Sequence, residues 1–276
     1  MFSATIDDVR KYWNSRPCNI RHSRAEVGTR RYFDEVEARK YFVEPHIPEF
    51  AHFERWRGKK VLEIGCGIGT DSINFARHGA AVTVIDVSTE SLALCKTRFD
   101  QFGLTARFYQ GNAEQLAQIV PIEQYDLIYS FGVIHHTPSP YRVIEHIKRF
   151  MGPHSELRMM MYSKWCWKTA WIVLRYGHGQ FWKAAQLVAE NSEAQTGCPV
   201  TYTYSGSDIR NQLLRDFNVL SIRKDHIFPY VIEKYVKHEY ERVWYFRCLP
   251  APVFRALERL AGWHMLIVAQ SKAPGR

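Results

Sequence analysis

Long hydrophobic runs are missing from this sequence. No stretch approaches the roughly 20 uncharged apolar residues that a transmembrane helix requires, so we expect no membrane-spanning helix. Charges at Asp7, Asp8 and Arg10 stand where a secretory signal would need apolar residues, so no such signal is expected. Six cysteines are present, but none form a C-x-x-C pair or stand with histidines at zinc-finger spacing. The simplest interpretation is a cytoplasmic protein with free thiols.

Acidic residues are the minority among the charged ones. Asp and Glu number 28 against 37 Lys and Arg, which leaves a net charge of +9 on 276 residues. A charge of this size favours an anionic partner, such as nucleic acid, a membrane surface or an acidic small molecule. The excess lies in the flanks, because residues 61–163 carry 8 basic and 10 acidic groups. The 46% of hydrophobic residues exclude disorder as the main state.

Short β-branched runs alternate with helical patterns from Lys59 onwards. Seven segments have the pattern of strands, namely 60–64, 81–86, 107–109, 125–130, 157–162, 217–222 and 265–270. Helical patterns separate most of them, at 70–78, 88–102, 141–150, 207–215 and 252–260. This alternation predicts an α/β, Rossmann-like fold with a seven-stranded, mostly parallel sheet and helices on both faces.

The remaining stretches are expected to cover this core. Residues 1–58 have helical patterns at 5–16, 30–44 and 49–56, broken by prolines, and predict an N-terminal helical lid. The rest divides into a core at 59–163, an aromatic and basic insertion after the fifth strand at 164–206, and the end of the core at 207–276, which contains a further insertion at 225–262 after the sixth strand.

A glycine-rich loop follows the first predicted strand. Gly65, Gly67 and Gly69 let the backbone approach a ligand without a Cβ clash, and the next helix offers free N–H groups. The dinucleotide fingerprint G-x-G-x-x-G would need a glycine where Thr70 stands. A nicotinamide-binding domain is therefore the disfavoured alternative. An acidic residue, Glu63, precedes the loop by two positions.

Polar residues also follow the next three strands. Asp86 ends the second, Asn112-Ala113-Glu114 follows the third, and Ser130 to His136 ends the fourth. Ligands of open α/β sheets bind at these carboxyl ends of the strands. Together with the Glu-x-Gly-x-Gly-x-Gly pattern at 63–69, the arrangement resembles the class I S-adenosylmethionine (SAM)-dependent methyltransferases, over about residues 59–163 and the final strands.

The resemblance implies SAM as cofactor, S-adenosylhomocysteine as product, and a role for each matching residue. Glu63 is expected to bind the methionine ammonium, and Asp86 to accept both ribose hydroxyls. The other implied contacts are the backbone of Gly65, Cys66 and Gly67 at the methionine, Val87, Asn112, Ala113 and Glu114 at the adenine, Ser130 at the methyl-transfer site, and Tyr32 closing over the cofactor. Cys66 is expected to pack rather than react.

Methyl transfer is an in-line displacement that mainly requires alignment. A base is needed only when the acceptor must lose a proton. His135 and His136 are candidates for that base, or for orienting the acceptor, because sequences resembling ubiquinone-type methyltransferases often carry a histidine here. The alternative is that they bond the loop backbone. No metal is expected, since neighbouring side chains on a strand end diverge and no carboxylate pair accompanies them.

The acceptor is expected to be held by the basic flanks. Arg21 and His22 follow Pro17 in a polar stretch that would clamp a carboxylate or another anion, or else form a solvated loop. Other candidate wall residues, which could instead pack within the lid, are Tyr12, Trp13, Tyr162, Trp165, His226 and Tyr230.

Three classes of function compete at this level. The favoured one is a methyltransferase for a small, polar or anionic metabolite. The second is a nucleic-acid or protein methyltransferase, which the net charge supports but which the missing Asn/Asp-Pro-Pro-aromatic motif disfavours. The third is a lipid- or quinone-directed enzyme at a membrane surface, or a binding module, because residues 164–183 interleave tryptophans with lysines and arginines. The acceptor atom and the oligomeric state stay open.

Overall fold

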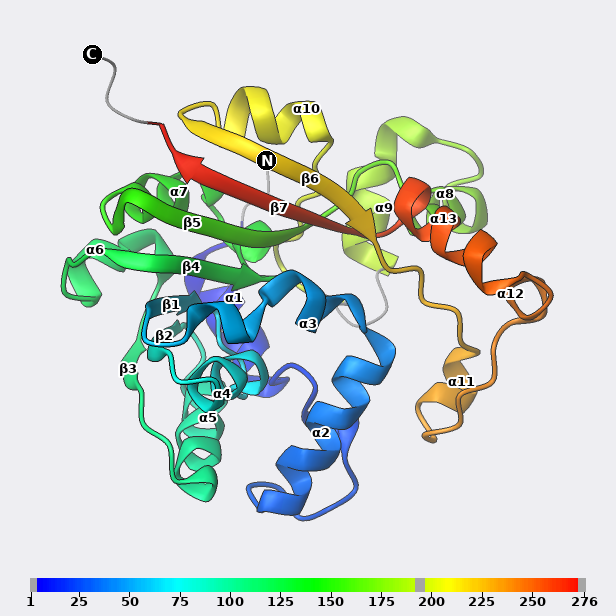
Figure 1. The fold of residues 1–276 in the computed structure, drawn as a ribbon. Helices are drawn as coiled ribbons and strands as arrows, with labels where there is room; N and C mark the ends of the chain where they lie inside the picture. The colour runs from blue at the N-terminus through cyan, green and yellow to red at the C-terminus, as the bar shows by residue number, and fades with distance from the viewer. Residues whose placement is uncertain (1–3, 192–196, 273–276) are drawn as a thin grey trace.

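A seven-stranded sheet forms the centre of the computed structural model, which describes residues 4–191 and 197–272 (Figure 1). The strand order is β3-β2-β1-β4-β5-β7-β6. The strands are β1 (Lys60–Ile64), β2 (Ala81–Asp86), β3 (Arg107–Gln110), β4 (Tyr125–Phe131), β5 (Met151–Tyr162), β6 (Phe217–Asp225) and β7 (His264–Ser271). The first five pair in parallel, and β7 runs antiparallel between β5 and β6. The predicted Rossmann-like fold is confirmed.

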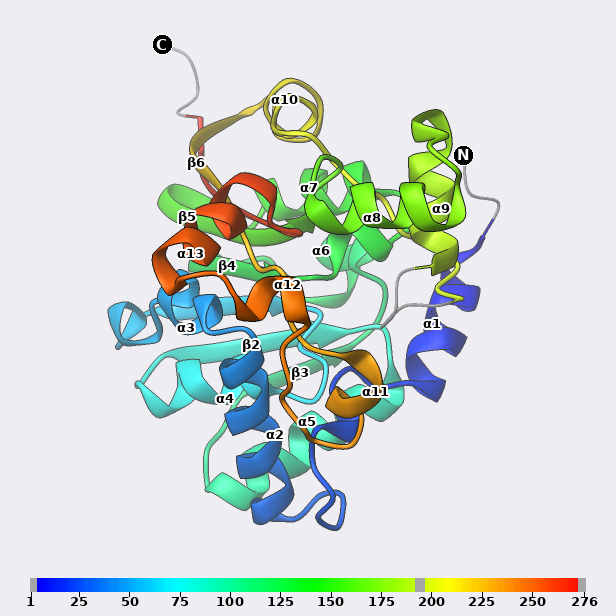
Figure 2. The ribbon, with the colours of Figure 1, turned by 90° about the vertical axis from the view of Figure 1, so that its right-hand side faces the viewer.

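Helices cover both faces of this sheet (Figure 2). They are α1 (Ile6–Ser15), α2 (Arg30–Val43), α3 (His46–Ala51), α4 (Thr70–Arg77), α5 (Thr89–Phe102), α6 (Leu116–Ile119), α7 (Pro140–Lys148), α8 (Trp167–Tyr176), α9 (Ala184–Asn191), α10 (Gly206–Asp208), α11 (Ile232–Tyr235), α12 (Trp244–Arg247) and α13 (Ala251–Ala261). Because side chains alternate along a strand, Val61 and Leu62 of β1 enter different apolar cores, one on each face.

Three local predictions are corrected. The single helix expected at 49–56 is α3 followed by a 3₁₀ turn at Phe53–Trp56, because His52 between them takes a left-handed φ of 50°. The helix expected at 207–215 is the short α10 followed by a π-helical turn at Ile209–Leu213. β5 begins at Met151 rather than 157, with a register irregularity against β4 where the Ser155 hydroxyl bonds the Gly152 N–H.

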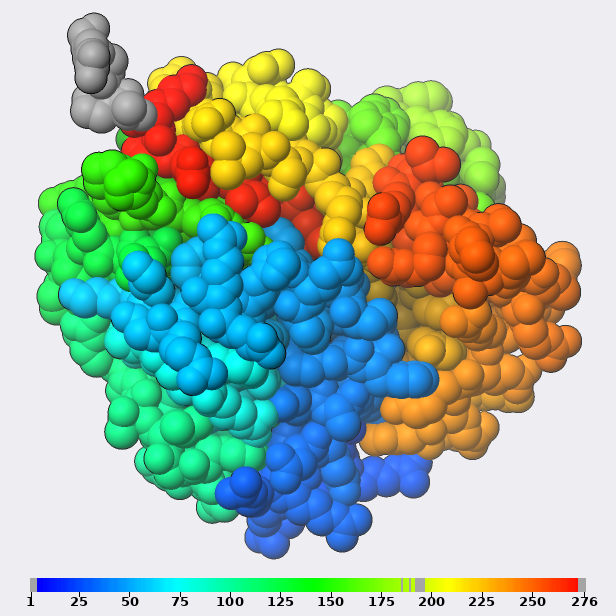
Figure 3. All heavy atoms as spheres, viewed as in Figure 1, coloured from blue at the N-terminus to red at the C-terminus, as the bar shows by residue number. Residues whose placement is uncertain are grey.

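The flanking segments meet above the carboxyl ends of the strands. Figure 3 shows residues 225–262, in orange, against α2, in blue. Buried Arg98 of α5 holds α2 in place by donating to the Phe33 carbonyl and to Glu37 at 3.2 and 2.7 Å. Among the helices in residues 4–191 and 197–272, none has the length and apolarity to cross a membrane.

Candidate functional site

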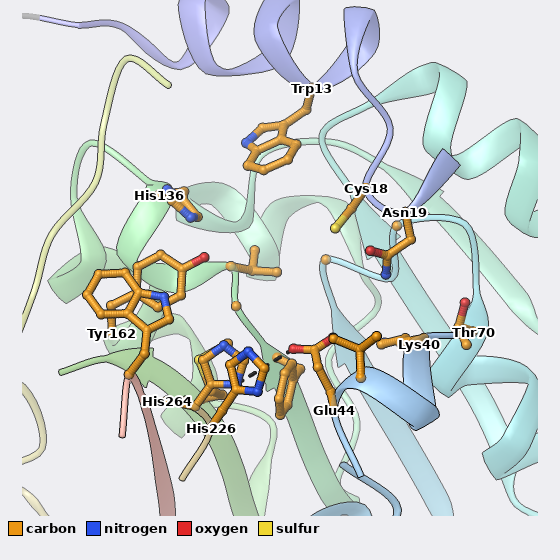
Figure 4. Close-up of a pocket in the computed structure, with 18 of the residues that line it drawn as sticks. Trp13, Cys18, Asn19, Lys40, Glu44, Thr70, His136, Tyr162, His226 and His264 are labelled. Carbon is orange, nitrogen blue, oxygen red and sulfur yellow. Dashed lines mark ion pairs between the residues drawn. The ribbon is translucent and has the colours of Figure 1, made fainter. Parts of the chain in front are cut away.

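One cavity of about 700 Å³ opens where the parallel strands end. Its lining comes from the loops after β1, β2, β3 and β4, from the N-terminal helices, and from the segment between β6 and β7. Figure 4 shows Trp13 and His136 on one side of the cavity and Glu44, His226 and His264 on the other. This volume is in the usual range for small-molecule sites.

The loop after β1 needs its glycines for two different reasons. Gly65 has φ +79°, and a Cβ there would lie 2.2 Å from Cγ2 of Val133. Gly67 has φ +52° and open space, with Cys18 Cβ at 4.0 Å as the nearest heavy atom that an added Cβ would meet. Gly65 therefore allows the loop to pack on the β4 end, while Gly67 leaves backbone exposed to the cavity. The exposed backbone at Gly67 can therefore be approached closely by a ligand in the cavity.

Asp86 is held at the end of β2 by the same loop. Its two carboxylate oxygens accept the N–H groups of Gly67 and Ser88, each at 2.8 Å. Burial raises the pKa of Asp86 to about 6, although these two backbone donors oppose the shift. The carboxylate lines the cavity with lone pairs left over, which fits a role in accepting hydroxyl groups.

Glu63 also lines the cavity, from β1. It is buried and accepts a short hydrogen bond from the Ser72 hydroxyl. Burial and the nearby Asp71 carboxylate raise its pKa well above the usual value. Asp71 in turn accepts from Lys40, at 2.7 Å, and from the Tyr129 hydroxyl. A ligand cation at Glu63 would therefore meet two carboxylates, of which one already has a lysine partner.

The structure brings most of the predicted cofactor residues to the cavity, but not all of them. Those that line it are Glu63, Gly65, Cys66, Gly67, Asp86, Val87, Asn112 and Ala113. Glu114 lies outside the lining, and its carboxylate accepts the Ser139 N–H at 2.7 Å. Ser130 is fully buried and donates to the Ile64 carbonyl. Tyr32 packs inside the lid, where its hydroxyl donates to the Ile20 carbonyl. These three side chains bind protein partners instead of facing the cavity.

The two adjacent histidines have different surroundings. His136 lines the cavity, with Nδ1 2.8 Å from the Val200 carbonyl and with Nε2 buried and without a hydrogen-bond partner. His135 is absent from the lining and packs its ring 4.0 Å from that of Tyr162. Burial lowers the pKa of His136 to about 4 and that of His135 well below its usual value. Of these two residues, only His136 lines the cavity.

Some of the predicted acceptor residues line the cavity and others do not. His22, Trp13, Tyr162, His226 and Tyr230 line the cavity. Tyr12, Arg21 and Trp165 do not, and the Trp165 side chain is 54% exposed. The short 3₁₀ helix at Ile20–His22 explains the separation of Arg21 from His22, because consecutive side chains on it point in different directions.

Two distant segments close the cavity against each other. The Tyr235 hydroxyl lies 3.2 Å from Nε2 of His22. Arg39 donates to the Tyr235 carbonyl and Arg24 to the Lys237 carbonyl, both at 2.6 Å. Polar groups of the segment 22–39 therefore pair with polar groups of the segment 235–237, more than 190 positions away in the sequence. Sequence reasoning missed this closure, because nothing in either segment indicates its partner.

The charge of the lining differs from that of the whole chain. Within the part of the chain that the structure describes, two lysines line the cavity, Lys40 and Lys168. Five carboxyl residues also line it: Glu44, Glu63, Asp71, Asp86 and Glu233. The basic excess of the flanks is thus not directed into the cavity, contrary to the expectation that it would bias the site toward anions.

A group of three potential metal ligands, which sequence reasoning missed, lies at one side of the cavity. Nε2 of His46 and Nδ1 of His264 are 3.0 Å apart, and Nδ1 of His264 is 3.7 Å from Oε1 of Glu44. The ring of His226 stacks on that of His264, with centroids 4.5 Å apart. Burial lowers the pKa of His46 to about 3 and raises that of Glu44 to about 7.

Comparisons with known proteins agree with this geometry. Residues 61–154 match the family described as "Methyltransferase domain". The ubiquinone biosynthesis O-methyltransferase of Pseudomonas savastanoi pv. phaseolicola is 36% identical over 100 residues, which are 36% of this chain and 43% of that protein. The enzyme of that name from Sodalis glossinidius is 27% identical over 155 residues, 52% of this chain and 62% of that one. The chain thus aligns with less than two thirds of either relative.

Solved structures support the same fold. Magnesium protoporphyrin IX methyltransferase from Synechocystis PCC 6803 with bound SAM has a TM-score of 0.57 at 16% identity, over 99% of this chain and 100% of that one. A SAM-dependent methyltransferase from Methanosarcina mazei has a TM-score of 0.56 at 18% identity, over 82% and 98% of the two chains. The family match, the sheet order and the glycine loop lead to one conclusion. The chain contains a class I SAM-dependent methyltransferase domain, with distant similarity to ubiquinone biosynthesis O-methyltransferases.

Proposed function

We propose that this protein transfers a methyl group from SAM to a small acceptor bound in the same cavity. The observation that carries the proposal is the cavity itself, in which the loops after β1 and β2 share one space with the aromatic residues of the lid. The contacts of residues 22–39 with 235–237 close one side of that space. A concave cavity of this size favours a small molecule over a nucleic acid or a folded protein.

The residues at the strand ends would hold the cofactor, whose sulfonium supplies an already activated methyl group. Glu63 would bind the ammonium group, and the backbone at 65–67 the rest of the methionine. Asp86 would accept the ribose hydroxyls, because its carboxylate keeps free lone pairs beside its two backbone donors. Val87, Asn112 and Ala113 would contact the adenine. Holding both reactants in one cavity supplies the alignment that the displacement requires.

His136 would orient the acceptor. Its low pKa keeps the imidazole neutral near pH 7. Its Nε2 is buried and has no hydrogen-bond partner, and would accept a hydrogen bond from a hydroxyl, thiol or amine of the acceptor once a small movement of the cavity lining exposes it. A group with a pKa of about 4 is a weak base, so the main contribution is positioning rather than full proton removal. The acceptor that fits this lining has an aromatic or apolar body and a proton-bearing polar group.

Calorimetric titration with SAM tests the cofactor half of the proposal. Asp86→Ala should weaken SAM binding at least about tenfold. It removes the carboxylate proposed to accept both ribose hydroxyls, and even one such charged hydrogen bond is worth about 1.5–3 kcal/mol. The matched control is Asp126→Ala, which removes a carboxylate that instead pairs with Lys59 and with the Lys60 N–H. Wild-type protein that fails to bind SAM would overturn the proposal.

The acceptor can be found with labelled SAM. The protein would be incubated with the methyl-labelled cofactor and a metabolite extract, and the labelled products identified by mass. We expect label in one small compound or a few related ones. Label that appears only in RNA, DNA or protein fractions would contradict a small acceptor.

A second candidate, an acceptor drawn from a membrane surface, is favoured by one observation. The stretch 165–182 exposes several aromatic side chains beside basic residues, with Trp182 80% exposed. Trp182→Glu should reduce sedimentation with anionic liposomes if this surface binds lipid. Trp244→Glu is the matched control, because Trp244 is 74% exposed in a different segment. Equal sedimentation of both variants and wild type would remove this candidate.

A further inference from the structure

The group formed by Glu44, His46 and His264 has the composition of a metal site. Two imidazole nitrogens and one carboxylate oxygen are the donor set of many catalytic zinc sites, in which a fourth position stays open. The candidate ligand atoms all lie within 4.8 Å of one another. Ligand atoms about 2.0–2.1 Å from a tetrahedral ion are about 3.3 Å apart, close to the 3.0 and 3.7 Å contacts at His264.

The chain around the group supports this interpretation. Metal-binding histidines usually direct their other ring nitrogen to a carboxylate. Here Nε2 of His46 faces His264, and its Nδ1 lies 4.0 Å from Oδ1 of Asp225. Asp225 is fully buried; its Oδ1 accepts from Arg255 at 3.1 Å, and its Oδ2, which has no hydrogen bond, lies 3.8 Å from Nη2 of Arg223. A hydrogen bond between the two histidines would explain their contact, and two arginines pair with Asp225, but neither accounts for the Glu44 carboxylate beside His264.

His226, the residue after Asp225, has an unusual backbone conformation beside the group of Glu44, His46 and His264. Its φ is +68°, a region that non-glycine residues adopt at a cost and that is frequent at functional sites. Its main chain is fixed by the Asp225 carboxylate and by the Trp263 N–H. The imidazole therefore lies against His264 and lines the cavity.

We propose that Glu44, His46 and His264 bind one divalent ion of the zinc type, with the open coordination position facing the cavity. Glu44 and His264 line the cavity, so an ion between them borders the space assigned to the acceptor. A second oxygen or sulfur of the acceptor, apart from the group at His136, would occupy the open position and lose its proton to solvent, because a bound ion stabilises the deprotonated form. This assignment of the acceptor group rests on the proposed function, whereas the ion site itself does not.

The direct test is titration of the chelator-treated full chain with Zn²⁺ alone, by calorimetry and by metal analysis after dialysis. We expect one ion per chain. Glu44→Gln and His46→Gln should weaken binding more than about 100-fold, and Asp225→Asn about 10- to 100-fold, the usual effect of losing an outer partner of a ligand. The matched control is His22→Gln, which changes another cavity histidine and should keep the affinity.

Two results would contradict the proposed ion site. Absence of stoichiometric Zn²⁺ on folded wild-type protein, or equal loss in His22→Gln and His46→Gln, would overturn the proposal. Circular dichroism shows whether each variant folds. If the ligand variants do not fold, the visible spectrum of the cobalt-loaded wild type replaces them, and an octahedral spectrum like that of free Co²⁺ would overturn the site. SAM titration of the metal-free chain is separate, so failure there would affect only the proposed function.

Discussion

The two halves of the cavity are built from the chain in opposite ways. The half that we propose for the cofactor uses short stretches, 63–67, 86–87 and 112–113, each at or just after the end of a strand of one sheet. The half that we propose for the acceptor takes its residues from the N-terminal helices, from the β4 and β5 ends and from the segment before β7. A site of the first kind is determined by local pattern and topology, whereas the second depends on how covering segments pack. Substitutions should therefore affect the two halves separately.

The largest effect is expected at the glycine loop. Gly65→Ala should destabilise the fold by about 3 kcal/mol and abolish measurable SAM binding, because its Cβ adds a clash with Val133 to a left-handed backbone strain. Gly58→Ala is the matched control, since Gly58 has φ +69° but open space, and should cost only about 1 kcal/mol. Urea unfolding measures both. Equal costs would show that the packing against Val133 contributes nothing.

A smaller effect, on the other half, is expected at His136. His136→Gln should lower kcat/KM for the identified acceptor about 10- to 100-fold, corresponding to the loss of one buried polar contact of about 1–3 kcal/mol. The affinity for SAM should stay within about twofold, because His136 belongs to the acceptor side. His135→Gln is the comparison, and a larger loss of turnover there, with the fold intact, would contradict the different placement of the two rings.

The pH dependence of SAM binding should follow Asp86. Its raised pKa of about 6 means that the carboxylate is ionised at pH 7.5 and becomes protonated as the pH falls through 6. In the role proposed for Asp86, the ionised form accepts both ribose hydroxyls, so the affinity for SAM should fall about tenfold between pH 7.5 and 5. Calorimetry across this range measures it, and Asp86→Asn should flatten the profile. Tighter binding in acid would contradict the assigned role.

The smallest effect is expected from the closure over the cavity. Tyr235→Phe removes one hydroxyl, 3.2 Å from His22, and keeps the ring. The apparent KM for the acceptor should rise about two- to tenfold, the value of one neutral hydrogen bond, with kcat and SAM affinity unchanged. A change in SAM affinity instead would show that this contact serves the cofactor half.

Most of the fold could be predicted, because the strand and helix patterns are strong and the order of elements along the chain limits the possible sheet topologies.

Three predicted cofactor residues do not line the cavity, namely Glu114, Ser130 and Tyr32, because their side chains bond other parts of the protein. Sequence position places a side chain near a strand end or in a lid, but the hydrogen bonds that turn it away come from residues such as Ser139 and Ile20 that no pattern indicates.

The sequence by itself determined the α/β fold, the glycine loop and the carboxylates Glu63 and Asp86, because each depends on short-range order along one strand and its loop. Only the tertiary structure decided which of two adjacent histidines faces the cavity, and how Glu44 and His46 meet His264. Those two segments are separated by more than 200 positions, and the packing of α3 beside the start of β7 brings them together. The tertiary structure also showed that the excess of basic residues stays outside the cavity. Which charged side chains line a cavity depends on how the segments pack and which side chains pair, and not on how many basic residues the sequence contains.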